Sequence, residues 1–175
     1  MFRIGLGTDT HRLEPGLPLW LGGVAVPSPV GCVAHSDGDV LLHALTDALL
    51  GAIGGGDIGE HFPDSDPRWK GQASRVFVEA AAERVRAAGY RVANVDAVVH
   101  LERVKLARYK QEIAASVRAI LGVSIASPKA AVRGASDPER VNVKAKTAEG
   151  CDAVGEGRAI GAQVVVLLER SDRGG

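Results

Sequence analysis

The chain has 175 residues, of which 46% are hydrophobic and 24% are charged. This length predicts a single domain over residues 1–175. The 21 basic and 21 acidic residues cancel, which argues against a nucleic-acid partner, because binding to a polyanion needs a surplus of Lys and Arg. The apolar run at 164–168 is too short to span a bilayer, so we expect no membrane partner and a cytoplasmic location.

The first part of the chain predicts two β segments followed by a helix. Residues 2–11 alternate loosely, as a strand does, and 18–29 have the pattern of a hairpin with Gly22-Gly23 as its turn. Ser36 is a good N-cap residue, and it predicts a helix over about 37–53.

The rest of the chain continues this alternation. The segment 57–74 is rich in Gly, Pro, Asp and Ser and predicts a long loop of the kind that often covers a site. Ser74 can cap the helix that follows. The remaining patterns predict a helix at about 75–88, a half-buried strand at 90–102, a helix at about 107–121, and strands at 140–150 and 159–169. This order predicts an α/β or α+β sandwich with a sheet on one side.

The stretch Asp9-Thr10-His11 carries the clearest chemistry. Residues i and i+2 of a strand face the same side, so Asp9 and His11 would present a carboxylate and an imidazole together. His43, on the predicted helix, could supply a third ligand, and two His with one carboxylate and an open position form a known catalytic zinc arrangement. The alternative is a plain strand end and a histidine satisfied in the core, since short matches occur by chance.

The predicted helix places His43 one turn away from each of two aspartates, Asp39 and Asp47. A carboxylate commonly holds the second ring nitrogen of a metal-bound histidine. We therefore expect Asp47, or else Asp39, to accept a hydrogen bond from the His43 ring.

Two other features suggest chemistry that their context does not support. The run from Gly54 to Gly59, "GGGDIG", matches the dinucleotide fingerprint, but it follows a predicted helix and opens a loop. That fingerprint needs a strand before it and a helix after it. Cys32 and Cys151 lack the spacing of a disulfide framework or a thiolate metal site, so we expect two small buried residues.

Three stretches carry a resemblance to a known family: "GLGTDTHRL", "AHSDGDVLLHALTDALLGAIGGGDIGEHFPDSDPRWKG" and "NVKAKTAEG". They resemble the 2-C-methyl-D-erythritol 2,4-cyclodiphosphate synthase family, the cyclases of the non-mevalonate isoprenoid route. The likeness covers about 1–106 and resumes at about 140–168. It implies a mixed sheet with helices packed on one side, and a homotrimer with an active site between each pair of neighbouring subunits.

The resemblance also implies roles at matching positions. Asp9, His11 and His43 would hold a divalent metal, usually zinc, and His35 and Thr147 would stabilise the transition state. Glu149 matches the ligand of a second metal, Mg²⁺ or Mn²⁺, held with the substrate's diphosphate. The segment 101–107 would hold the cytidine from a neighbouring subunit. The positions that match substrate-binding residues are Ser36, Asp57, Ile58, Gly59, Phe62, Pro63, Asp64, Ser65, Asp66, Leu101, Lys105, Leu106, Ala107, Lys146 and Ala148.

The implied reaction is an intramolecular phosphoryl transfer, catalysed by a phosphorus–oxygen lyase. The substrate is a cytidine diphosphate ester, 4-diphosphocytidyl-2-C-methyl-D-erythritol 2-phosphate. Its 2-phosphate attacks the β-phosphorus, closes the ring of 2-C-methyl-D-erythritol 2,4-cyclodiphosphate and expels CMP. Several negative charges must be brought together, so the main requirement is electrostatic. No side-chain nucleophile is needed.

The chain departs from the family pattern at a few places. Val104 precedes Lys105 where Pro is usual, and Ala148 lies where many members have Thr or Ser. Ala153 and Glu156 stand where many members have Phe and Arg, the Arg being near the centre of the trimer. The segment 125–137 has the character of an insertion, which we interpret as a surface excursion.

Two other functions compete with the cyclase. A metal-dependent phosphohydrolase could use the same three metal ligands to activate water, because metal-bound water can reach a pKa of about 7. A non-catalytic trimeric binding module could hold isoprenoid phosphates at the trimer centre, but Ala153 and Glu156 weaken that hypothesis. The products formed from the cytidine diphosphate ester would discriminate among the three.

Overall fold

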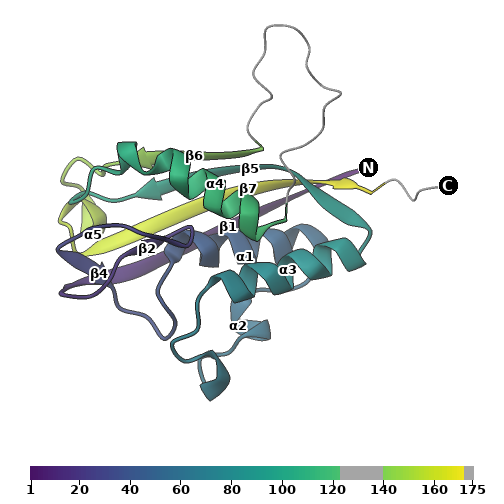
Figure 1. Ribbon diagram of the computed structural model, residues 1–175, viewed down its shortest axis with the longest axis horizontal. Coiled ribbons are helices and arrows are strands. Elements are labelled where there is room, and N and C mark those ends of the chain that lie inside the picture. Colours follow the sequence, from purple (N-terminus) through teal and green to yellow (C-terminus); the bar gives the residue numbers. More distant parts are fainter. Residues whose placement is uncertain (123–139, 172–175) are drawn as a thin grey trace, which may run out of the picture.

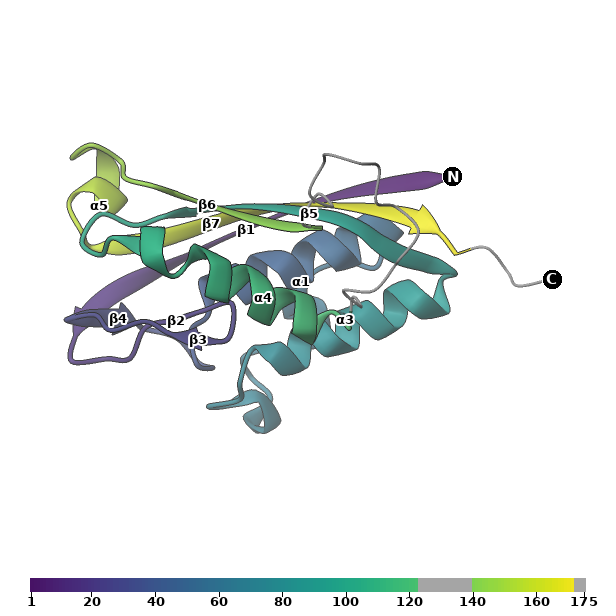
Figure 2. The same cartoon turned by 45° about the horizontal axis from the view of Figure 1, so that its top comes forward.

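A five-stranded sheet with helices against one face dominates the described part of the protein, residues 1–122 and 140–171 of a computed structural model (Figures 1 and 2). The predicted insertion at 125–137 lies outside the described residues. The strands are β1 (Phe2–Pro15), β2 (Trp20–Leu21), β3 (Val24–Ala25), β4 (Val30–Cys32), β5 (Tyr90–His100), β6 (Val141–Lys146) and β7 (Ala159–Arg170). The helices are α1 (Val40–Ile53), α2 (Ile58–His61), α3 (Arg75–Ala87), α4 (Lys110–Ile120) and α5 (Asp152–Gly155), with short 3₁₀ helices at Pro67–Trp69 and Leu106–Arg108.

The sheet is mixed. In the strand order β4-β1-β7-β5-β6, β5 and β6 run parallel while the other neighbours run antiparallel. Helices α1, α3 and α4 lie on one side of it (Figure 2), with α1 along β1 and β7. The strands β2 and β3 form a separate hairpin whose turn is Gly22-Gly23. The predicted hairpin, mixed sheet and one-sided helical layer are confirmed.

Helix α1 packs directly on the backbone of β1, and two glycines permit this approach. A Cβ atom on Gly5 would lie 1.9 Å from the carbonyl oxygen of Ala48, and one on Gly7 would lie 1.9 Å from that of Ala44. Neither position can carry a side chain without separating the two elements. Because alternate strand residues share a face, the next residue in this row, Asp9, also faces the helical layer.

Helix α1 begins later than the sequence predicts. Its first residue is Val40 and its N-cap is Asp39, whereas Ser36 and a start near residue 37 were expected. Gly38 has a φ of +72°, in the left-handed region, which interrupts a helical path between Ser36 and Asp39. The predicted cap was therefore wrong, and Ser36 is free to take part in the site described below.

The Asp39 side chain ties the β2–β3 hairpin to the start of α1. Its carboxylate is fully buried and accepts hydrogen bonds from the backbone amides of Leu42 at 3.1 Å, Gly22 at 2.9 Å and Gly23 at 2.7 Å. Burial raises the pKa of Asp39, and these three backbone donors oppose that rise. Asp39 therefore has a structural role, and it does not contact the His43 ring as we predicted.

The segment 57–74 is more ordered than the loop that we predicted. Asp57 caps α2 by accepting a hydrogen bond from the amide of Glu60 at 2.9 Å. Asp66 caps the 3₁₀ helix Pro67–Trp69 in the same way, through the amide of Arg68 at 3.0 Å. Gly54, with a φ of +70°, ends α1. The "GGGDIG" run therefore links two helices, which confirms that it is not a dinucleotide fingerprint.

The two cysteines differ in burial. Cys32 lies buried in β4, where burial raises the pKa of its thiol to about 12. Cys151 is exposed, so the prediction of burial was wrong for this residue. It follows a turn after β6 in which Glu149 and Gly150 both have positive φ, and this turn carries the chain out of the sheet.

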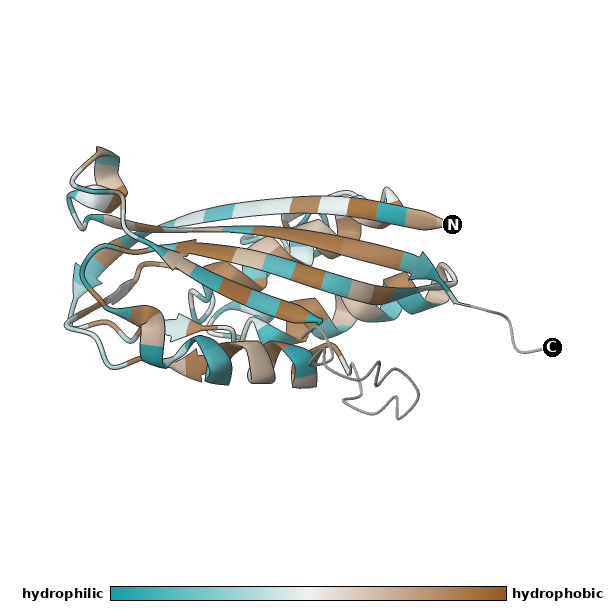
Figure 3. Cartoon of the chain, turned by 90° about the horizontal axis from the view of Figure 1, so that it is seen from above, coloured by the Kyte–Doolittle hydropathy of each residue, from teal (hydrophilic) through white to brown (hydrophobic). Residues whose placement is uncertain are grey.

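The face of the sheet opposite the helices is open in the single chain. Phe2, Ile4 and Leu6 of β1 are 65%, 71% and 64% exposed, and Val165 of β7 is 42% exposed. We call these four residues the apolar stripe; Figure 3 shows hydrophobic segments on both strands. Within the described residues, the helices are too short or too polar to cross a bilayer.

Candidate functional site

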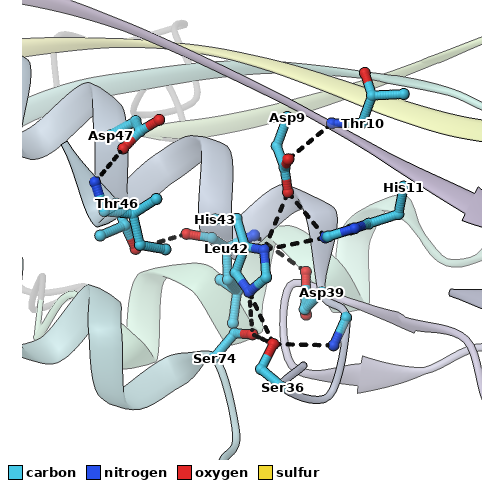
Figure 4. A network of polar contacts seen from close by, with 12 residues as sticks. Asp9, Thr10, His11, Ser36, Asp39, Leu42, His43, Thr46, Asp47 and Ser74 are labelled. Atoms are coloured by element: carbon cyan, nitrogen blue, oxygen red, sulfur yellow. Dashed lines mark hydrogen bonds and ion pairs between the residues drawn. The ribbon is translucent and has the colours of Figure 1, made fainter. Parts of the chain in front are cut away.

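Three predicted metal ligands converge where β1 passes α1 (Figure 4). The Asp9 Oδ2 atom lies 3.0 Å from both His11 Nε2 and His43 Nδ1, and the two ring nitrogens lie 3.1 Å apart. Asp9 and His11 share one face of β1, as their spacing predicts, and His43 comes from the first turn of α1. One ligand atom from each residue lies within 4.8 Å of the others, so this triad could hold a metal ion.

The electrostatics of the triad suit a cation. Burial raises the pKa of Asp9, but hydrogen bonds and charge interactions with His11 and His43 outweigh it and hold the pKa well below its usual range. If the two imidazole nitrogens that face each other at 3.1 Å both carried protons, those protons would repel each other. Two lone pairs in the same positions can instead bind one cation. Two nitrogens and one carboxylate oxygen fit a divalent metal such as zinc.

The second nitrogen of the His43 ring faces two hydroxyl groups. His43 Nε2 lies 2.8 Å from Ser74 Oγ and 3.1 Å from Ser36 Oγ. Ser74 precedes α3, as the sequence predicted, but its side chain makes no capping hydrogen bond. Its hydroxyl instead contacts the His43 ring, which the sequence analysis missed.

The predicted contact between His43 and Asp47 is not present. Asp47 Oδ1 accepts a hydrogen bond from the backbone amide of Ile58 at 2.7 Å (Figure 4 shows the two side chains apart on α1). This prediction was wrong because α2 folds back on α1 and gives the carboxylate a nearer donor. Asp47 thereby positions the start of α2, whose residues face the cavity beside the triad.

A cavity of about 510 Å³ opens beside the triad. Of the residues that the sequence singled out, it gathers ten from four segments of the chain. These are Asp9, His11, His35, Ser36, His43, Ile58, Gly59, Phe62, Pro63 and Asp64. The cavity is therefore the place where the metal-binding and most of the early substrate-binding predictions meet.

Aromatic side chains form one wall of this cavity. The ring centroid of Phe62 lies 4.8 Å from that of Phe77 and 5.2 Å from that of Trp69, and Phe77 lies 6.0 Å from the His43 ring. The sequence analysis did not select Trp69 or Phe77. Phe77 lies on the first turn of α3, so only the packing of α3 beside α1 reveals its proximity.

Three of the predicted residues in this region do not line the cavity. Asp57 and Asp66 use their carboxylates as helix caps, and Asp66 also accepts hydrogen bonds from the Arg68 guanidinium, which lowers the pKa of that carboxyl. Ser65 is exposed between them. In this conformation the Asp57 and Asp66 side chains stabilise the short helices of the segment 57–74.

The later predicted residues gather elsewhere, where β5 and β6 end. The Leu101 amide donates to the carbonyl of Lys146 at 2.9 Å, which holds the two segments together. Leu101 and Leu106 are buried, so they would offer a ligand mainly backbone groups, while Lys105 and Ala107 are exposed. None of these five residues lines the cavity beside the triad.

The turn after β6 carries the remaining predicted residues. The Thr147 hydroxyl donates to Glu149 Oε1 at 2.5 Å, and the Ala148 amide donates to Glu102 Oε2 at 3.0 Å. Thr147 is partly exposed and Glu149 is exposed. Their side chains are thus held by local bonds at a surface that is separate from the metal cavity of the same chain.

Comparisons with known proteins identify the family. A profile of the YgbB family matches residues 2–169. The chain is 50% identical over 167 residues to the chloroplastic 2-C-methyl-D-erythritol 2,4-cyclodiphosphate synthase of Arabidopsis thaliana, which covers 95% of this chain and 67% of that protein. It is 47% identical over 169 residues to the synthase of Bordetella avium, which covers 97% of this chain and 96% of that protein.

Solved structures show the same fold. A 2C-methyl-D-erythritol-2,4-cyclodiphosphate synthase in its CDP-bound form matches with a TM-score of 0.81 and 43% sequence identity, over 95% of this chain and 100% of that chain. The chain therefore belongs to the YgbB family and is related along nearly its whole length to proteins named 2-C-methyl-D-erythritol 2,4-cyclodiphosphate synthase.

Proposed function

We propose that the chain converts 4-diphosphocytidyl-2-C-methyl-D-erythritol 2-phosphate into 2-C-methyl-D-erythritol 2,4-cyclodiphosphate and CMP, as a phosphorus–oxygen lyase. One observation carries the proposal: two histidines and an aspartate converge at the edge of a cavity whose walls hold six of the fifteen expected substrate-binding positions. The names of the relatives and the CDP-bound neighbour support the same substrate class.

Asp9, His11 and His43 would hold the metal, and we propose zinc because imidazole and carboxylate ligands suit it. A metal bound there supplies positive charge that can polarise a phosphoryl oxygen. The chain supplies the geometry: the close packing of α1 on β1 fixes the three ligand atoms before any substrate arrives.

The residues of the cavity would fold the substrate onto itself. His35 and Ser36 lie on the cavity wall, where their polar side chains can donate hydrogen bonds to phosphate oxygens. A 2-phosphate oxygen held against the β-phosphorus then forms the new P–O bond. The bond from that phosphorus to the bridging oxygen breaks, and the oxygen leaves with its electron pair on CMP. No water is consumed, which separates this reaction from that of the alternative phosphohydrolase.

We assign Thr147 and Glu149 to the other half of the reaction. The Thr147 hydroxyl would donate to the phosphoryl oxygens as charge develops, and Glu149 would be the protein ligand of a Mg²⁺ or Mn²⁺ ion held with the diphosphate. Their hydrogen bond at 2.5 Å supports a shared location. An exposed carboxylate with neighbouring phosphate oxygens is the ligand set that Mg²⁺ prefers.

We also propose a homotrimer with active sites between subunits. The position of the β5–β6 end supports it, because none of its predicted residues lines the metal cavity of the same chain, and only Ala148 shares a second, smaller cavity with Asp9. The apolar stripe supports it as well, since Phe2, Ile4, Leu6 and Val165 leave a hydrophobic sheet face for another copy to cover.

Phosphorus NMR of the protein mixed with the cytidine diphosphate ester, zinc and Mg²⁺ tests the proposed reaction. Appearance of the cyclic diphosphate together with CMP supports it. Release of inorganic phosphate instead would indicate the phosphohydrolase, and unchanged substrate would indicate a binding module.

A further inference from the structure

The structure gives His43 a defined hydrogen-bonding partner behind the metal site. Ser74 is fully buried, and its hydroxyl lies between the His43 ring and the Asp37 carboxylate. The backbone amide of Ser74 also donates to Asp37 Oδ2 at 3.0 Å, so Asp37 holds the residue through both its amide and its hydroxyl. Asp37 is fixed in turn, because its own amide donates to the Gln72 carbonyl at 3.1 Å.

The direction of these bonds follows from donor and acceptor chemistry. An ionised carboxylate can only accept, so the single Ser74 hydroxyl proton points at Asp37. The Ser74 oxygen then has only lone pairs to offer His43, so it can accept the ring proton when that proton lies on Nε2. The Asp9 carboxylate, 3.0 Å from Nδ1, can also only accept, so without a metal it competes for the same proton. With the proton held on Nε2 by Ser74, His43 Nδ1 keeps a lone pair for a metal, and this is the atom that faces Asp9 and His11.

We infer that Ser74, oriented by Asp37, is a positioning residue that holds His43 in the tautomer and ring orientation required for metal binding. The inference rests on the proposed function only in taking the triad as a metal site. It replaces the carboxylate that we expected directly on the ring with a serine hydroxyl polarised by a carboxylate. Groups of this kind, when removed, typically weaken metal affinity about 10- to 100-fold.

Ser36 is the competing partner of the ring. Its oxygen lies 3.1 Å from His43 Nε2 and 3.4 Å from Ser74 Oγ, and it accepts a hydrogen bond from the Gly38 amide at 3.2 Å. Among the described residues, no carboxylate accepts the Ser36 proton. Ser36 is partly exposed to the cavity, whereas Ser74 is buried. The Ser74 hydroxyl is therefore the better-fixed acceptor.

Zinc affinity, measured by competition with a chromophoric chelator, tests the inference without substrate. We expect Ser74→Ala to lose about 10- to 100-fold in affinity, Ser36→Ala to lose less, and Ser74→Thr, which restores a hydroxyl, to recover part of the loss. The matched control is Thr46→Val, because Thr46 is a buried residue of α1 whose hydroxyl donates to the Leu42 carbonyl at 2.8 Å. It should leave zinc affinity unchanged.

Nitrogen NMR of ring-labelled histidine supplies a second readout in the metal-free protein. The fraction of neutral His43 with its proton on Nε2 should fall in Ser74→Ala and in Asp37→Asn, which keeps the side-chain volume if the alanine variant folds poorly. Unchanged zinc affinity and tautomer in Ser74→Ala, a loss confined to Ser36→Ala, or an equal loss in Thr46→Val would overturn the inference. Because the tautomer is measured without metal, a shift of the His43 proton away from Nε2 in Ser74→Ala would support the role of Ser74 even if the wild type binds no zinc. Absence of zinc binding by the wild type would instead remove the proposed metal site.

Discussion

The metal-binding end and the β5–β6 end of this chain both carry predicted site residues but are built differently. At the metal end, Asp9, His11 and His43 are 25%, 17% and 13% exposed and point at one another. At the other end, Glu149 is exposed and accepts a hydrogen bond from the partly exposed Thr147. The first group is assembled within one chain, whereas the second presents its side chains outward, as a surface for a partner does.

The largest expected effect comes from breaking the metal end. His43→Ala should remove tightly bound zinc and nearly all turnover, because only two of the three protein ligands remain. His43 is partly exposed and lies outside the buried hydrophobic core, so the fold should survive. Elemental analysis after gel filtration measures the zinc content, and circular dichroism checks the fold.

The matched control for this variant is His100→Ala, which removes an imidazole from the end of β5. His100 belongs to no described triad of metal ligands, so full zinc content is expected. A His43→Ala protein that retained full zinc would contradict the assignment of the triad.

Mixing two inactive variants tests whether the two ends act across subunits. Lys105→Glu should abolish turnover by placing a negative charge where the cytidine diphosphate would bind, while its metal end stays intact. Refolding it together with His43→Ala should restore partial activity, since some subunit interfaces then pair an intact metal end with an intact β5–β6 end. Each variant refolded alone is the control. No recovery in verified mixed oligomers would place the whole site within one chain.

The packing of α1 on β1 can be broken without touching a ligand. Gly7→Ala places a Cβ 1.9 Å from the Ala44 carbonyl oxygen, so the helix must move away from the strand that carries Asp9. We expect a loss of about 1–3 kcal/mol in the free energy of unfolding, measured in urea, together with weaker zinc binding.

The control for this change is another glycine of the same helix. Gly51→Ala meets nothing within 4 Å and should stabilise α1 by about 0.5–1 kcal/mol. If Gly7→Ala were as stable as Gly51→Ala, the close approach of α1 to β1 would not be what positions the metal ligands.

How much of this could be read from the sequence depends on how local each contact is. The pairing of Asp9 with His11 follows from the two-residue repeat of a strand, and the helix around His43 follows from its apolar pattern. The contact of Ser74 with His43 joins residues that lie far apart in the chain, so no local pattern contains it. The resemblance to a family named the candidate substrate segments, yet it did not reveal that Asp57 and Asp66 serve as helix caps.

The two predictions of an aspartate on the His43 ring were wrong for one cause. Asp47 is one helical turn from His43, and on an isolated helix the two could interact. The α2 segment offers the Ile58 amide to that carboxylate, and burial raises the pKa of Asp47 while this hydrogen bond lowers it. Similarly, Asp39 lies one helical turn from His43 in the sequence, but its carboxylate accepts hydrogen bonds from the backbone amides of the distant Gly22-Gly23 turn. In both cases, backbone donors from another part of the fold bind the carboxylate in place of the His43 ring.

The smallest expected effect probes the open sheet face near the β5–β6 end. Asp96 accepts hydrogen bonds from the Lys144 ammonium at 2.5 Å and the Asn142 amide at 2.8 Å, and the Lys144 bond chiefly lowers the pKa of Asp96 below 3.8. Both charged side chains are 42% exposed. For such a pair in a single chain, Asp96→Asn should cost about 0.2–1 kcal/mol of unfolding free energy at low salt, and less at high salt. A lowered folded pKa means that this contribution is fully present above about pH 4 and disappears as the pH falls through the folded value. Urea unfolding of wild type and variant at pH 7 and pH 3, with and without added salt, measures both dependences.

The same measurement tests whether another subunit covers this face of the sheet. If it does, the loss of unfolding free energy at pH 7 should exceed the range for an exposed pair and should persist at high salt. A loss that salt abolishes would show that Asp96 stays in water and that the covered surface is limited to the apolar stripe.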